Sequence, residues 1–112
     1  MYAFICDDLT DTASTYAYGL FIDDKLIAQC SIGGAEEIDV AGSDDELLSD
    51  VYVLPEYRQR HYALTLLKYV METPEHNKHN IWCMPVNETA EFYHKIGFVY
   101  ANQTLMLHSA VI

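Results

Sequence analysis

The segment from Leu47 to Met71 constrains the fold most, because it joins a strand pattern to a helix pattern through a short turn. Leu47–Leu54 is a β-rich run that stops at Pro55, which lacks the N–H needed to extend a β-ladder. The apolar residues that follow recur at spacings of three and four, on one face of a helix: Ala63, Leu66, Leu67, Val70 and Met71. A strand that leads directly into such a helix indicates a sheet with helices packed on it.

The rest of the chain extends this pattern to the order β-ββ-β-α-β-α-ββ. Further strands are expected at residues 2–6, 17–22, 26–32, 80–84, 98–101 and 104–108. A second helix is expected between Asn87, a good N-cap, and Gly97, a good C-cap. The predicted fold class is α/β (α+β), with one mixed sheet and two main helices in a single domain over residues 1–112.

Composition places the chain among globular proteins, since 51% of its 112 residues are apolar and the mean hydropathy is -0.01. No apolar run approaches the ~20 residues that cross a bilayer, so we expect no membrane partner and a cytoplasmic location. Cys6, Cys30 and Cys83 are expected to be buried thiols. We expect no metal site, and a surface position for the four histidines that lack metal-ligand spacing: His76, His79, His94 and His108.

The net charge of -11 is concentrated in one half of the chain. Residues 1–55 carry 12 acidic residues and one base, Lys25, whereas residues 56–112 carry five of each. The acidic half repels nucleic acid and anionic membranes and attracts cations, so we expect no nucleic-acid partner. The alternative is that the acidity only maintains solubility.

The turn between the strand and the first helix has the composition of an anion site. A helix N-terminus presents free backbone N–H groups and the positive end of the helix dipole, and Arg58 and Arg60 add two charges beside it. This combination favours a phosphate or pyrophosphate. The alternative is a helix start that carries two solvated arginines.

A second motif, read together with the turn, identifies a family. Residues 87–98 read N-x-x-A-x-F-Y-x-K-x-G-F, from Asn87 through Phe92, Tyr93, Lys95 and Gly97 to the phenylalanine that follows. The earlier segment matches V-x-P-x-x-R and the acyl-CoA loop [Q/R]-x-x-G-x-[G/A] in part, at the positions Val53, Pro55, Arg58 and Ala63. In this order the two segments resemble the GNAT superfamily of acetyl-CoA-dependent N-acetyltransferases.

The resemblance implies an enzyme that transfers the acetyl group of acetyl-CoA to a primary amine. The cofactor would lie where the strands at residues 47–54 and 80–84 separate, with its pantetheine arm along the first of these strands. The cofactor-binding residues that the resemblance implies are Val51, Tyr52, Val53, Arg58, Gln59, Arg60, His61, Tyr62, Ala63 and Asn87. The acceptor would be a cationic small molecule or a protein, because it must pass the acidic residues 36–50.

Two features depart from the family pattern. His61 stands where the loop usually has a glycine, whose missing Cβ lets the backbone approach the pyrophosphate; its imidazole could crowd the phosphates or donate to them. Residues 1–16 leave no room for the two helices that usually precede the central hairpin. The acceptor side is therefore expected to be open, or completed by a partner subunit in a possible homodimer.

The reaction needs an acid for the leaving thiolate and a base for the attacking ammonium. Tyr93 matches the tyrosine that serves as the acid in many members, although it could be only a core aromatic residue. Asp50 is the first candidate for the base, but strict alternation turns it away from the cleft unless a β-bulge intervenes. Glu46 and a water relay are the alternatives.

The sequence also allows an alternative function that is not catalytic. The same scaffold could be a catalytically weak or inactive interaction protein whose acidic half binds a basic partner. Acetyl-CoA binding without turnover on any amine would favour this alternative.

Overall fold

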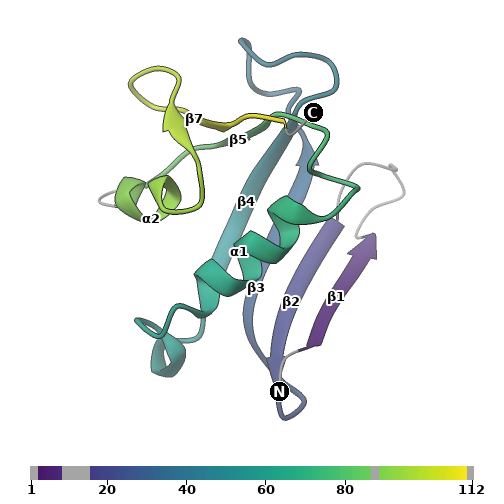
Figure 1. Ribbon diagram of the computed structural model, residues 1–112, viewed down its shortest axis with the longest axis vertical. Coiled ribbons are helices and arrows are strands. Elements are labelled where there is room, and N and C mark those ends of the chain that lie inside the picture. Colours follow the sequence, from purple (N-terminus) through teal and green to yellow (C-terminus); the bar gives the residue numbers. More distant parts are fainter. Residues whose placement is uncertain (1–2, 9–15, 87–88, 111–112) are drawn as a thin grey trace.

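A mixed sheet of seven strands is the centre of the part of the chain that the computed structural model describes, residues 3–8, 16–86 and 89–110 (Figure 1). The strands lie in the order β1-β2-β3-β4-β5-β7-β6. Their bounds are β1 Ala3–Asp8, β2 Tyr16–Ile22, β3 Lys25–Gly34, β4 Glu46–Val53, β5 Ile81–Cys83, β6 Val99–Tyr100 and β7 Met106–His108. The helices are α1, Tyr62–Glu72, and α2, Ala90–His94, and a single 3₁₀ turn covers Pro55–Tyr57. The predicted fold class and element order are confirmed.

Helix α1 lies across one face of β2, β3 and β4, and this contact forms the main core (Figure 1). Of the five residues on the predicted helical face, Leu66, Leu67, Val70 and Met71 are at most 4% exposed, whereas Ala63 is partly exposed and borders a cavity. The four buried residues pack against apolar side chains of the sheet that are buried as completely, among them Leu20, Ile32, Leu48 and Ile81. Cys30 and Cys83 are buried in the same core as free thiols, and burial raises the pKa of each to about 12.

The acidic loop between β3 and β4 covers part of the opposite face of the sheet. Ala35 and Ile38 pack there against Trp82 of β5. The Trp82 indole Nε1–H donates to Asp45 Oδ2 at 2.8 Å, and the backbone N–H of Gly42 donates to the same oxygen. Asp45 therefore ties this loop to the sheet and is not one of its free charges.

Helix α2 is shorter than predicted. It begins at Ala90, with Thr89 as a cap residue that makes no side-chain capping bond, and the expected cap Asn87 lies outside the described residues. Gly97 has a φ of +103°, as expected of a residue that ends a helix, and a Cβ there would meet the His108 ring at 3.1 Å. The glycine is thus required both by its backbone angle and by its neighbour.

The sheet opens between β4 and β5. These parallel strands pair only at Glu46 with Ile81 and at Leu47 with Trp82, and then they separate. The separation falls where the sequence placed it, and it leaves the remainder of β4 without a partner strand on that side.

Within the described residues, no helix is long and apolar enough to span a membrane.

Candidate active site

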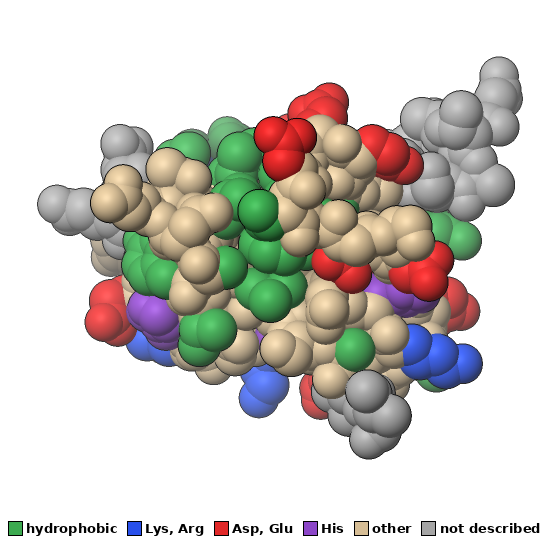
Figure 2. All heavy atoms as spheres, turned by 90° about the horizontal axis from the view of Figure 1, so that it is seen from above, with side chains coloured by type: hydrophobic (Ala, Val, Ile, Leu, Met, Phe, Trp, Pro, Cys, Tyr) green, Lys and Arg blue, Asp and Glu red, His purple; other side chains and the backbone are tan. Residues whose placement is uncertain are grey.

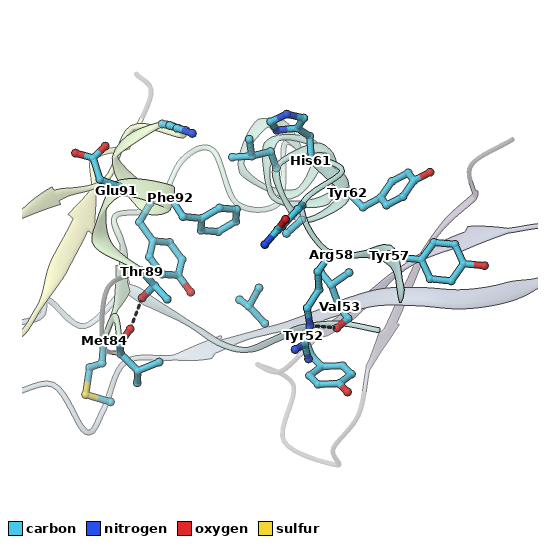
Figure 3. Close-up of a pocket in the computed structure, with 17 residues that line it drawn as sticks. Tyr52, Val53, Tyr57, Arg58, His61, Tyr62, Met84, Thr89, Glu91 and Phe92 are labelled. Carbon is cyan, nitrogen blue, oxygen red and sulfur yellow. Dashed lines mark hydrogen bonds between the residues drawn. The ribbon is translucent and has the colours of Figure 1, made fainter. Parts of the chain in front are cut away.

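The opening of the sheet holds a cavity of about 590 Å³ (Figure 3). Its walls are the end of β4, the turn that leads into α1, the first turn of α1, and on the other side Met84, Val86 and residues of α2 and its ends. In Figure 3, Phe92 and Thr89 from the α2 side face Arg58 and Val53 across the cavity. The two motifs found in the sequence therefore form opposite walls of one cavity.

Most of the predicted site residues line this cavity. They are Val51, Tyr52, Val53, Arg58, Gln59, His61, Tyr62 and Ala63 for the cofactor, and Tyr93 for catalysis. Arg60 is exposed and does not line it, and Asn87 lies outside the described residues. Sequence reasoning did not select Phe92 or Lys95, which also line the cavity, although both belong to the second motif and could have been found there.

A β-bulge interrupts β4 beside the cavity. Gln29 pairs with Tyr52 and Ser31 with Ser49, so two residues, Asp50 and Val51, stand opposite the single residue between Gln29 and Ser31. Asp50 adopts the left-handed conformation that such a bulge demands, with a φ of +54°. The bulge is the condition under which Asp50 could turn toward the cleft, yet its side chain is exposed and does not line the cavity. Its role as the base stays a prediction.

Glu46, the second candidate for the base, is committed to another contact. Its carboxylate accepts a hydrogen bond from His76 Nδ1–H at 2.8 Å, at the end of β4 that pairs with β5. The other ring nitrogen, Nε2, forms a hydrogen bond with the Tyr18 hydroxyl at 2.6 Å. His76 is 0% exposed, so its expected surface position was wrong: a residue in the connection after α1 is enclosed by strands distant in sequence.

Two residues in the turn before α1 have left-handed backbone angles. Gln59 has a φ of +63°, and His61, the cap residue of α1, has a φ of +64°. Residues other than glycine rarely adopt this conformation, because Cβ crowds the carbonyl oxygen. The glycine that the resemblance places at this position would adopt the conformation without strain. Such strain outside glycine is typical of functional sites.

Arg58 is bonded to the strand beside it. Its Nε–H donates to the Val53 carbonyl at 2.8 Å, and its guanidinium lies 5.2 Å from the centre of the Tyr52 ring (Figure 3). These contacts fasten the turn to the end of β4. The turn therefore holds the N-terminus of α1, with the positive end of its helix dipole, beside the cavity.

Tyr93 is half-buried between the cavity and the core. Its ring makes edge contacts with the rings of Phe92 and Phe98, at centroid distances of 5.1 and 5.6 Å. Burial, with a smaller contribution from the neighbouring Cys83 and Cys30, raises the pKa of its hydroxyl to about 12. The phenol is thus protonated at neutral pH, as a proton donor must be, and it also packs as a core aromatic residue.

Comparison with known proteins identifies the family of the chain that carries this cavity. The acetyltransferase (GNAT) domain family matches residues 14–100. The chain therefore belongs to the GNAT acetyltransferase family, as its two motifs indicated, and acetyl-CoA is the co-substrate expected of such a domain. A search among curated proteins gave no match.

Solved structures share the fold. An N-acetyltransferase of Bacillus subtilis, solved in complex with coenzyme A, is 23% identical with a TM-score of 0.63, and the match covers 83% of this chain and 66% of that one. A putative acyl-CoA N-acyltransferase of Klebsiella pneumoniae is 13% identical with a TM-score of 0.70, and the match covers 99% of each chain. A KacTA–DNA complex is 17% identical with a TM-score of 0.64, covering 88% and 69%. The chain thus spans about two thirds of some relatives and the whole of another.

Proposed function

We propose that this protein transfers the acetyl group of acetyl-CoA directly to a primary amine. The observation that carries the proposal is the cavity itself, which is lined by the free end of β4, the strained turn at the start of α1 and the protonated Tyr93. A long cofactor with amide groups and several phosphates would fit a cavity whose lining runs from a free strand edge to a helix N-terminus.

Backbone groups at the end of β4 and in the turn that follows it would hold the cofactor. Beyond the bulge, the backbone of Val51–Val53 has no β5 partner and can pair with the amides of the pantetheine arm. The turn from Arg58 to Ala63 offers the first N–H groups of α1 and the positive end of its dipole to the pyrophosphate. Asn87 belongs to the same proposal, as a contact for the pantetheine arm.

The chemical step needs proton transfers at both the nitrogen and the sulfur. The amine nitrogen attacks the acetyl carbonyl carbon, the C–S bond breaks, and the thiolate that leaves takes the Tyr93 proton. The proton that the nitrogen loses as the amide forms returns to the tyrosine oxygen, directly or through water. The ammonium form of the acceptor must first lose a proton, for which Asp50, directly or through a water molecule, is the candidate base. Glu46 is disfavoured as the base because its carboxylate is occupied by His76.

We propose a cationic acceptor, either a small amine or an amino group of a protein. Exposed acidic residues, among them Glu36, Glu37, Asp39 and Asp44, lie on the loop that borders the sheet. Figure 2 shows acidic side chains gathered over part of the face at this end of the molecule. Their field attracts cations and opposes binding to nucleic acid, so we continue to expect no nucleic-acid partner.

Thiol release from acetyl-CoA in the presence of amines and basic proteins tests this function, with mass spectrometry of the product. Tyr93→Phe keeps the ring and should lower kcat by about 10²–10⁴-fold, the usual effect of losing a general acid, with little change in cofactor affinity. A kcat within about twofold of wild type would leave Tyr93 as a core residue only.

The second candidate function is an interaction protein that binds a basic partner through the acidic half. The net charge of -11 and the histidine in place of the loop glycine favour it. Binding of acetyl-CoA without turnover of any of the amines or basic proteins tested would favour this function. Light scattering at several protein concentrations would test the predicted homodimer.

A further inference from the structure

A second cavity, of about 470 Å³, lies between the C-terminal half of α1 and the segment that ends α2. Its lining includes Lys68 and Glu72 from α1, Lys95 just after α2, and His108 from β7. Lys95 also lines the first cavity, so the two cavities adjoin at this side chain.

The charges along these cavities differ from those of the rest of the chain. Three of the six bases in the sequence, Arg58, Lys68 and Lys95, line them, against two acids among the described lining residues, Glu72 and Glu91. In a chain with 17 acidic residues, this local excess of bases is not needed for solubility. It indicates an anionic ligand that extends from one cavity into the other.

The two lysines are available to such a ligand. Where the chain is described, neither Lys68 nor Lys95 has a carboxylate within 4.0 Å; the ion pairs there join Lys25 to Glu56 and Glu46 to His76. His108 adds no fixed charge, because burial lowers the pKa of its imidazole and favours the neutral ring. The positive charge of the second cavity therefore comes from the lysines.

The distance along α1 fits one nucleoside. Lys68 follows Tyr62, the first residue of the helix, by six residues, which is roughly 9 Å at the rise of an α-helix. A ligand whose first phosphates bind at the helix N-terminus can place a further phosphate at Lys68 if a single sugar separates them. Coenzyme A has this chemistry, since its ribose carries the pyrophosphate at one position and a phosphate monoester at the 3′ position.

We propose that the cavity between Lys68 and Lys95 binds the 3′-phosphate monoester of the cofactor, and that the protein thereby distinguishes coenzyme A from 3′-dephospho-coenzyme A. This inference rests on the proposed function, because it takes the helix N-terminus as the pyrophosphate site. Lys68 and Lys95 are then specificity-determining residues for the nucleotide end of the cofactor.

Isothermal titration of both ligands into matched variants tests the proposal. Wild type should bind coenzyme A about tenfold more tightly than the dephospho form, because two ammonium groups meet a dianion. Lys68→Met keeps an unbranched side chain and should reduce this preference to about twofold, while the affinity for the dephospho form stays unchanged. Lys78→Met removes the same charge outside both cavities and should keep the wild-type preference.

Each other outcome has a distinct meaning. If wild type binds both ligands equally well, the proposal is overturned while the proposed function stands. If neither ligand binds at millimolar concentration, the proposed function fails first. A loss of preference in Lys78→Met equal to that in Lys68→Met overturns the local site in favour of a long-range charge effect. Inorganic phosphate that binds through Lys68 without competing with coenzyme A overturns the assignment to the cofactor's own phosphate.

Discussion

Replacing His61 with glycine should stabilise the unliganded protein, contrary to the usual effect of glycine at a helix start. His61 has a φ of +64°, and its exposed imidazole makes no hydrogen bond within the described residues. The interactions at this position come from its backbone carbonyl, which accepts from the N–H and the Oγ1–H of Thr65, and glycine keeps both.

The magnitude follows from two opposing terms. Relief of the left-handed conformation is worth roughly 1–2 kcal/mol for a residue with a Cβ. The greater freedom of glycine in the unfolded chain costs about 0.5–1 kcal/mol. The net gain should be about 0.5–1 kcal/mol, which for a domain of this size raises Tm by roughly 2–5 °C.

Arg60→Gly is the matched control in the same turn. Arg60 is exposed and does not have a positive φ, so glycine there brings only the entropic cost. In urea and thermal unfolding, the free energy of unfolding should fall in Arg60→Gly and rise in His61→Gly, relative to wild type. Equal destabilisation by both glycines would refute the strain argument, and with it this explanation of the usual glycine in the loop.

Three further perturbations test other contacts of the site and its support. Arg58→Ala should lower the free energy of unfolding of the unliganded protein by about 0.5–1.5 kcal/mol, because it removes the bond to the Val53 carbonyl; an unchanged Tm would mean that Arg58 does not fasten the turn. Because the pKa of Tyr93 is raised to about 12, the acid stays protonated at alkaline pH, and kcat should not fall as pH passes 10; a fall centred near 10 would contradict the buried phenol. Tyr18→Phe leaves the buried His76 Nε2 without its hydrogen-bond partner and should cost about 1–3 kcal/mol in urea unfolding; a loss well below this range would show that the ring nitrogen finds another partner.

Several properties of this protein could be predicted from local sequence. The buried face of α1 follows from the spacing of its apolar residues. Strand β4 ends at Val53, two residues before Pro55, which cannot donate to a ladder. Gly97 lies three residues after the end of α2, and its φ of +103° is one that glycine adopts most readily. The two motifs indicated the family and the two walls of the cavity. These signals are local, since each depends on residues within one or two turns of the chain.

The remaining features depend on contacts between distant segments, and only the tertiary structure decided them. The bulge at Asp50 comes from the pairing of β4 with β3, and alternation within β4 alone cannot reveal it. His76 is buried because Glu46 and Tyr18, 30 and 58 residues away in sequence, supply partners for both ring nitrogens. Arg60 and Arg58 look equivalent in sequence, but only Arg58 reaches the cavity wall, because the closed turn points one side chain at the strand end and the other at solvent. Residue types and spacing specify which chemistry a chain can carry, whereas cross-strand register and burial determine which of those groups meet.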